Sequence, residues 1–296
     1  HDHARPYHVT VADFNKDHRS DVVVVDSEQN QIHILLEFDE KTFSKITTYD
    51  GIIESRPVFT AIADFDADNQ LDIAIANYGT ENVLVLSQYS IKTTYRQTNY
   101  FVGKDSRPTA VIIYDFNNDN QLDFVVNNIN NNSILVFAGS DKGTFEREAE
   151  YSTGSNSAPL SVVVADINND NHTDIVVVNS GNDNIAIFLG YGDGAFRMVA
   201  IYSTGVRSQP YMAAISDLNN DNKLDIAVVN PGSNNILLFY GYGNGSFGNE
   251  TIYPLNYAYQ PYSIAIDDLN QDGWMDIVVD CYRTDQMEIL IKMCQS

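Results

Sequence analysis

Short apolar runs separated by polar turns recur along the whole chain. A typical unit opens with a proline and continues through an apolar run ("SVVVADI") into an acidic loop ("DINNDNHTD"). It goes on through a second apolar segment ("DIVVVNS"), a polar turn ("NSGNDN"), a third segment ("IAIFLG") and a glycine-rich turn before a fourth ("GYGDGAF"). Runs of this length, rich in β-branched residues and bounded by Gly, Asn, Asp and Pro, predict four short strands per unit.

The unit recurs every 51 residues without insertion or deletion. A fixed period of about this length indicates a repeat architecture rather than two unrelated domains. We therefore expect a single domain over residues 1–296. Its opening prolines are Pro6, Pro57, Pro108, Pro159, Pro210 and Pro261. The corresponding repeats are 6–56, 57–107, 108–158, 159–209, 210–260 and 261–296, the last of them partial.

The first three strands of each unit are apolar on both faces, so each sheet must be covered on both sides. Stacking successive sheets around a ring covers both faces and leaves only short edges. The sequence therefore predicts an all-β fold, a six-bladed β-propeller of four-stranded antiparallel blades. The last copy keeps only 36 of 51 residues. Blade six is thus expected to be three-stranded, or the chain is part of a larger one that completes it.

The net charge of the chain limits which partners it can bind. The formal net charge is −23, from 40 acidic and 17 basic residues, which argues against nucleic acid or an anionic membrane as partner. No apolar run approaches the roughly 18 residues of a membrane span, so we expect no membrane insertion. The first residues lack the apolar core of a signal peptide, which fits a trimmed secreted chain as well as a cytosolic one.

Acidic residues concentrate in the nine-residue loop after the first strand. Positions one, three, five and nine carry Asp or Asn, while position seven varies freely, as expected where the ligand is the backbone carbonyl. Oxygen ligands in this number suit calcium better than magnesium. The candidate metal ligands are Asp13, Asn15, Asp17, Arg19 and Asp21; Asp64, Asp66, Asp68, Gln70 and Asp72; Asp115, Asn117, Asp119, Gln121 and Asp123; Asp166, Asn168, Asp170, His172 and Asp174; Asp217, Asn219, Asp221, Lys223 and Asp225; and Asp268, Asn270, Asp272, Trp274 and Asp276.

This loop is not an EF-hand, because position twelve is Val or Ile inside the second strand instead of glutamate. A single copy leaves two interpretations open, a cation site or an acidic turn whose side chains satisfy local backbone amides. Six copies, each with about three carboxylates in close proximity, are costly without a counterion. We therefore expect about six structural Ca²⁺ ions, with the loop of Lys16, His18 and Arg19 the weakest. Position six, mostly Asn, is expected to adopt left-handed backbone.

The loop pattern D-x-[DN]-x-D-[NG]-x-x-D between two strands, followed by a G-x-G-x-F turn, resembles the FG-GAP (VCBS-type) repeat. That repeat occurs in the propeller of integrin α-subunits and in calcium-stabilised lectin-like propellers. The resemblance covers essentially the whole chain, although copy two ("SQYSIKTTY") lacks the glycine turn and copy one keeps only Phe43. It implies structural calcium and a role in cell adhesion or ligand capture, without naming a ligand.

A candidate ligand surface lies on the face opposite the calcium loops, where the turns after strands two and four meet. We expect this face to bind a carbohydrate or an acidic protein segment, with tyrosines giving flat contact area and arginines contacting anions. The alternative is that the arginines pair with neighbouring carboxylates and the tyrosines fill gaps. The candidate residues are Arg5, Arg56, Arg107, Tyr7, Tyr211 and Tyr262.

Two other functions remain open. An enzyme, a lyase or hydrolase, has little support, because no G-x-S-x-G or H-E-x-x-H motif occurs. The terminal "HDH" could hold copper or nickel through His1 and His3, which the sequence leaves undecided. The third possibility is a non-binding structural module of a larger extracellular protein.

The expected compartment is extracellular. Extracellular calcium modules bind at about 10⁻⁴ to 10⁻³ M, so loops of this kind would be mostly empty in cytosol. Cys281 and Cys294 would sit at opposite ends of one hairpin, roughly 20 Å apart, too far for a disulfide; their redox state stays open. Four N-x-S/T sequons agree with secretion, at Asn131, Asn171, Asn244 and Asn249.

Overall fold

The computed structural model describes residues 5–38, 42–87, 96–248, 250–255, 260–281 and 286–290. Within these ranges the chain forms 23 strands and one short 3-10 turn, Ser180–Asn182, which confirms the all-β class. His1, His3, Asn249 and Cys294 lie outside the described residues. No described segment forms a helix long and apolar enough to span a bilayer.

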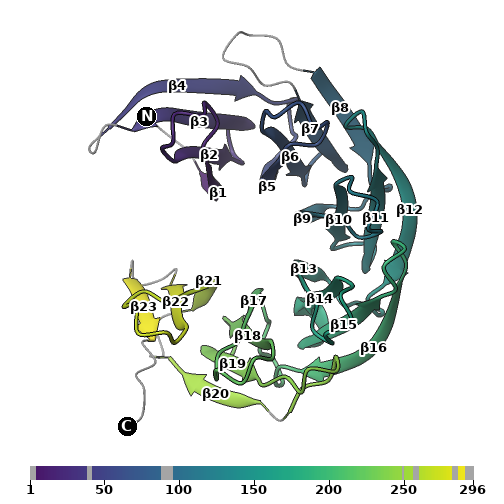
Figure 1. The fold of residues 1–296 in the computed structure, drawn as a ribbon, viewed down its shortest axis with the longest axis vertical. Coiled ribbons are helices and arrows are strands. Elements are labelled where there is room, and N and C mark those ends of the chain that lie inside the picture. Colours follow the sequence, from purple (N-terminus) through teal and green to yellow (C-terminus); the bar gives the residue numbers. More distant parts are fainter. Residues whose placement is uncertain are drawn as a thin grey trace. The chain divides into compact units, whose positions relative to one another are not determined.

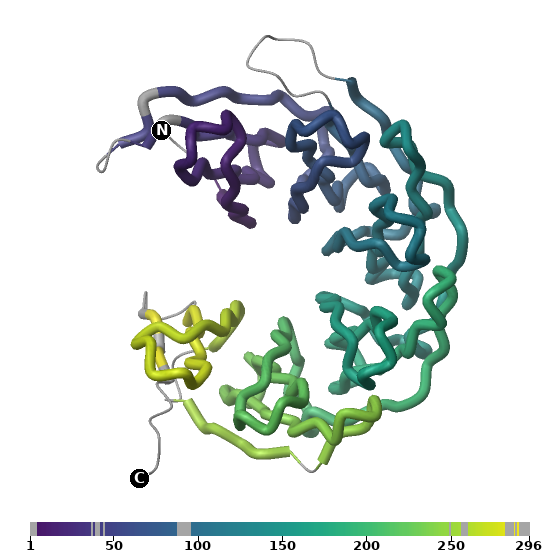
Figure 2. The backbone as a smooth tube through the Cα atoms, viewed as in Figure 1, coloured from purple at the N-terminus to yellow at the C-terminus, as the bar shows by residue number. Residues whose placement is uncertain are grey.

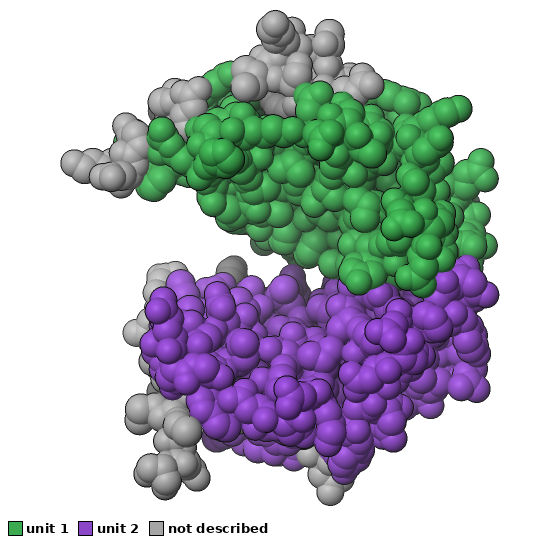
Figure 3. All heavy atoms as spheres, viewed as in Figure 1, with its two compact units in different colours: residues 1–150 green, residues 151–296 purple. Residues whose placement is uncertain are grey.

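The chain divides into two compact units, residues 1–150 and 151–296 (Figure 3). Unit 1 holds three antiparallel four-stranded sheets, each built from four consecutive strands (Figure 1). The strands are β1 (Pro6–Ala12), β2 (Asp21–Asp26), β3 (Gln31–Phe38) and β4 (Phe43–Asp50); β5 (Pro57–Ala63), β6 (Asp72–Asn77), β7 (Asn82–Ser87) and β8 (Arg96–Phe101); and β9 (Pro108–Tyr114), β10 (Asp123–Asn128), β11 (Ser133–Gly139) and β12 (Phe145–Ser152).

Unit 2 holds two four-stranded sheets and a smaller sheet that has three strands in the described residues. The tube in Figure 2 follows the same up-and-down course through each of them. The strands are β13 (Pro159–Ala165), β14 (Asp174–Asn179), β15 (Asn184–Gly190) and β16 (Phe196–Ser203); β17 (Met212–Ser216), β18 (Asp225–Asn230), β19 (Asn235–Phe239) and β20 (Thr251–Pro254); and β21 (Pro261–Asp267), β22 (Asp276–Cys281) and β23 (Gln286–Leu290).

The opening proline begins the first strand of every sheet except the fifth, where β17 begins at Met212. In those five sheets a register shift follows directly after the proline, for example between Pro57 and Phe59. Such a bulge leaves one residue out of the pairing and redirects its side chain. Tyr7 and Tyr262, two predicted ligand residues, occupy this position.

The sheets pack face to face within each unit, as their two-sided apolar strands require. All six residues of the second strand are buried in β6, β10, β14 and β18. In unit 1, β1 contacts β5 and β5 contacts β9, so successive first strands are neighbours. The chain thus buries apolar side chains mainly between one sheet and the next.

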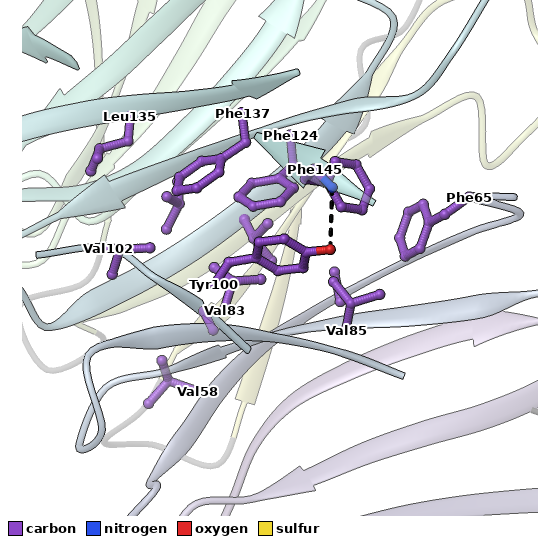
Figure 4. Close-up of a cluster of buried hydrophobic side chains, with 14 residues drawn as sticks. Val58, Phe65, Val83, Val85, Tyr100, Val102, Phe124, Leu135, Phe137 and Phe145 are labelled. Atoms are coloured by element: carbon purple, nitrogen blue, oxygen red, sulfur yellow. Dashed lines mark hydrogen bonds between the residues drawn. The ribbon is translucent and has the colours of Figure 1, made fainter. Parts of the chain in front are cut away.

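The largest buried cluster in unit 1 lies between the sheets of repeats two and three (Figure 4). Tyr100, from β8, meets the rings of Phe124, Phe137 and Phe145 edge-on at centroid distances of 5.8, 6.2 and 5.5 Å. Edge-to-face contacts of this kind add to the stabilisation from burial. The recurring tyrosine of one repeat is therefore a core residue shared with the next.

Candidate functional site

The acidic loops lie between the first and second strand of each sheet, and their side chains fold the loop around themselves. In the third copy Asp115 accepts hydrogen bonds from the backbone N–H groups of Asp119 (3.2 Å) and Asn120 (2.9 Å). Asn117 accepts a second bond from the N–H of Asp119 (3.0 Å), and Asp119 accepts one from Gln121 (2.7 Å). Positions one, three and five thereby turn their oxygens toward the loop interior. The same four bonds are present in the first, fourth, fifth and sixth loops, so five of the six loops have the complete set.

Two positions of every loop adopt left-handed backbone. Position six does so with φ between 62° and 85°, which confirms the sequence prediction. Position four does so as well, with φ of 60° at Lys16, 56° at Ala67 and 59° at Gln271. This second bend was not foreseen, because Lys, Ala and Gln do not favour left-handed backbone, which costs such residues roughly 1–2 kcal/mol. Closure of the loop therefore imposes a backbone conformation that the position-four residues do not favour by themselves.

The aspartate at position nine begins the second strand and is almost fully buried in every copy. In the fourth copy the two oxygens of Asp174 accept bonds from the N–H groups of Ile167 (3.0 Å) and Gly190 (2.9 Å). It therefore ties the loop to the end of the third strand. A carboxylate has about four lone-pair sites, so these two bonds leave capacity for a cation. Asp123 and Asp225 make the same pair of bonds.

The charge in these loops is poorly compensated by the protein. Burial raises the pKa of Asp174 to about 6, repulsion from Asp170 and Asp166 adds to the effect, and the two backbone bonds oppose it. Burial likewise raises the pKa of Asp123 and Asp225. A positive ion inside the loop would remove the repulsion and lower these pKa values. Burial and mutual repulsion thus raise the pKa of the position-nine carboxylate in these three loops.

The second loop gives the most direct test of whether the residues fit a metal ion. Asp64, Asp66 and Asp72 each place an oxygen within 4.8 Å of the others. The Oδ1 atom of Asp66 is buried and has no hydrogen-bond partner. A Cβ on Gly143, from the next repeat, would lie only 2.8 Å from the Cβ of Asp66, so the glycine allows close cover over the loop. An orphaned carboxylate oxygen beside two others fits a hard cation.

Position-seven side chains lie near the position-five aspartate in two copies. His172 Nδ1 is 3.6 Å from Asp170, and Lys223 Nζ is 3.4 Å from Asp221. Both pairs are partly exposed and therefore weak. The expectation that position seven contributes its backbone carbonyl stays a prediction.

The candidate ligand residues are divided between the two units. Arg56 and Arg107 line a common cavity of about 360 Å³ in unit 1. In unit 2, Tyr211 and Tyr262 pack edge-on against each other with ring centroids 4.7 Å apart. Tyr7 is 51% exposed, and the backbone N–H of Arg5 donates to Asp26. The cavity is also lined by Glu54, Tyr78, Gly79, Glu81, Asp105 and Asn130.

The two arginines of the cavity keep their charge available. Arg107 lies over the ring of Tyr78, with its guanidinium carbon 5.3 Å from the ring centroid. Within the described part of the chain, neither Arg56 nor Arg107 makes an ion pair within 4.0 Å. Both have positive φ, 44° and 53°, although each precedes a proline. Ala158, Gln209 and Gln260 have the same backbone before their prolines, so this conformation belongs to the repeat and does not distinguish the cavity.

Sequence reasoning missed the six other residues of this cavity. The turn of Tyr78, Gly79 and Glu81 stands on the expected face, but nothing in it distinguishes these residues from other polar turns. A periodic signal existed for Glu54 and Asp105, which occupy the same place in consecutive repeats, two residues before each arginine.

The comparisons with known proteins agree with the repeat and the fold. The FG-GAP-like repeat matches the sequence over residues 13–75, 64–126, 115–177, 166–228 and 217–279. The chain belongs to the FG-GAP-like repeat family. No curated protein matches the sequence.

Solved structures similar to this FG-GAP protein include virginiamycin B lyase from Staphylococcus aureus, with a TM-score of 0.66 at 16% identity over 99% of this chain and 86% of that one. An Agrocybe aegerita lectin that recognises non-reducing terminal N-acetylglucosamine has a TM-score of 0.62 at 16% identity, covering 93% and 74%. BBS1N, crystallised in complex with ARL6DN, has a TM-score of 0.60 at 14% identity, covering 94% and 77%. At such identities the likeness shows the fold alone, and the predicted FG-GAP repeat propeller is confirmed.

Proposed function

We propose that this FG-GAP protein is a secreted, calcium-stabilised propeller of six blades that binds a carbohydrate or protein ligand at the strand ends opposite the calcium loops. The observation that carries the binding function is the cavity of about 360 Å³ with Arg56 and Arg107 in its wall, unpaired within the described residues. Concave sites with a few convergent polar groups are the usual places for ligands.

The calcium part of the proposal is supported by the orphaned oxygen of Asp66 and by the raised pKa values of Asp123, Asp174 and Asp225. Positions one, three, five and nine of each loop, with the backbone carbonyl at seven, would hold the ion. Calcium supplies positive charge that offsets the mutual repulsion of these carboxylates. The chain's own residues position the oxygens through the backbone hydrogen bonds described above.

The partner class is supported by relatives of the same fold. One of them recognises a terminal N-acetylglucosamine, and another was crystallised with a protein partner. Millimolar calcium, which such loops need, is available outside the cell. The sequons at Asn131 and Asn244 lie on exposed residues, in agreement with secretion, whereas Asn171 lies inside a calcium loop.

A glycan and protein array probed with the whole chain in millimolar calcium tests the proposal. We expect binding of at least one ligand, lost in an Arg56→Ala/Arg107→Ala double variant. Gln209→Ala, at the matching place before a proline in unit 2, is the control and should bind normally. A ligand bound equally well by the double variant would place the binding site elsewhere. Thermal unfolding with and without chelator tests the calcium part.

A further inference from the structure

The cavity of unit 1 has a lining that restricts the chemistry of its ligand. Apart from Gly79, every lining residue is polar or charged, and Tyr78 provides the one aromatic ring. A peptide with apolar side chains would find little apolar surface in this wall. A ligand with many hydroxyl groups can use carboxylates and amides as acceptors and rest a C–H face on a ring. The lining therefore favours a sugar over a peptide.

The cavity offers charges of both signs at once. Arg56 and Arg107 share its wall with Glu54, Glu81 and Asp105, and in the described residues no ion pair within 4.0 Å joins any of them. Glu81 accepts the backbone N–H of Asp105 through one oxygen (2.8 Å). The other carboxylates remain available as acceptors for ligand hydroxyls. Unpaired guanidiniums are suited to bidentate contact with a carboxylate.

The balance of these charges limits the ligand's own charge. Two arginines and three acidic residues give the wall no excess of positive charge, so a multiply sulfated or phosphorylated ligand would be repelled. A ligand with one carboxylate and several hydroxyl groups can use both, with its carboxylate on the arginines and its hydroxyls on the acidic side chains. We propose, building on the proposed binding function, that this cavity binds a carboxylated sugar residue, of the uronic or sialic acid class.

The equivalent place in unit 2 lacks these groups. Ala158 and Gln209 stand where unit 1 has Arg56 and Arg107, and Arg207 replaces Asp105. The carboxylate-binding groups are thus specific to the junction of the first three repeats. This difference supplies matched controls within the same chain.

The test uses a pair of ligands that differ only in the acid group. Methyl β-glucuronide and methyl β-glucoside are titrated into the whole chain in millimolar calcium, and binding is followed by NMR or calorimetry. We expect the glucuronide to bind at least about tenfold more tightly. Arg56→Ala and Arg107→Ala should each remove that preference, and Gln209→Ala should leave it unchanged. An unfolding curve for each variant shows that its fold is intact.

Other outcomes overturn the inference. Equal binding of the two glycosides, unaffected by the arginine variants, would refute carboxylate recognition while leaving the proposed ligand-binding function in place. Inorganic sulfate competing as well as the glucuronide would show that only charge is sensed and would refute the role of the hydroxyl groups. Failure to bind either glycoside, with a protein captured on the array, would refute a sugar ligand and keep the proposed function.

Discussion

The hydroxyl oxygen of Tyr100 accepts a hydrogen bond of 3.2 Å from the backbone N–H of Phe145 in the following repeat (Figure 4). The two rings also meet edge-on, 5.5 Å apart at 88°. The tyrosine of the fourth strand and the phenylalanine of the glycine turn, two separate marks of the repeat, therefore form one joint between consecutive sheets. Tyr151 with Phe196 and Tyr202 with Phe247 repeat the arrangement.

Tyr100→Phe should destabilise the protein by about 1–3 kcal/mol, because it leaves the buried N–H of Phe145 without an acceptor while keeping the ring contacts. Urea unfolding in calcium measures the loss. Tyr114→Phe, which removes a hydroxyl from a ring that is 48% exposed, is the control and should change little. Equal stability of the two variants would contradict a role for this bond in the joint.

Much of the fold could be predicted because the same elements recur in successive repeats, the first three strands in all six and the fourth strand in five. A proline such as Pro57 or Pro159 marks where a first strand begins, and fully apolar second strands reveal sheets covered on both sides. The tyrosine and the phenylalanine of the turn were seen as recurring letters, but their partnership joins residues 45 apart in the sequence. No local pattern reports such a distant contact.

The site was predictable only where side chains repeat. The oxygen positions of the loops follow from the spacing of Asp and Asn in the sequence. The left-handed backbone at Ala67 results from closure of the loop, and the conformational preference of alanine does not predict it. The cavity was half foreseen. Arg56 and Arg107 are visible as an exception before the prolines, but Tyr78 of the second sheet meets Arg107, which precedes the third sheet, only because the two sheets stack.

Asp66→Asn should weaken calcium binding at the second loop by about tenfold, and Asn117→Asp should strengthen binding at the third, since ligand charge tunes affinity in oxygen sites. Asp66 is the acidic exception at position three, where the other loops carry Asn. Calorimetric calcium titration, or the calcium-dependent rise in unfolding temperature, measures both changes. Asp141→Asn, outside the loops, is the control. Unchanged titrations would contradict a metal in these loops.

His8 should make the protein more sensitive to acid. Burial against Phe59, with ring centroids 3.9 Å apart, lowers the pKa of His8 to about 4. Its Nδ1 accepts the backbone N–H of Thr60 (3.3 Å), a bond that protonation at this atom would break. Between the ordinary histidine pKa near 6.5 and the folded value, the unfolded chain holds more protons. The contribution of neutral His8 to the free energy of unfolding is therefore fully present above pH 6.5 and is lost as the pH falls from 6.5 toward the folded pKa.

In His8→Gln the decline between pH 7 and pH 5 should be smaller than in the parent by about 1–2 kcal/mol. Urea unfolding at each pH, in chelator so that calcium binding does not contribute, gives the slopes. His33→Gln, a histidine of the same sheet that bonds Thr48 instead of stacking on a ring, is the control and should keep the parent slope. Parallel slopes for the parent and His8→Gln would refute this assignment.

Asp183 holds the turn that leads into the fifth repeat. Its two oxygens accept the backbone N–H groups of Arg207 (2.7 Å) and Gln209 (2.9 Å), and its own backbone is left-handed with φ 52°. Asn30 and Asn234 occupy the same place in their repeats and each accept the N–H of the residue before the next proline. These side chains therefore fix the strained residues that precede Pro57, Pro210 and Pro261.

Asp183→Ala removes both acceptors and places a less tolerant residue in left-handed backbone, so we expect a loss of about 2–4 kcal/mol. Asp183→Asn keeps one acceptor and the backbone tolerance, and it should lose less. Because the effect is local, hydrogen exchange at Arg207 and Gln209 should accelerate in Asp183→Ala while exchange in β14 stays slow. Acceleration throughout unit 2 would instead show that the substitution loosens the whole unit, and unchanged exchange at the two amides would show that the carboxylate does not hold the turn.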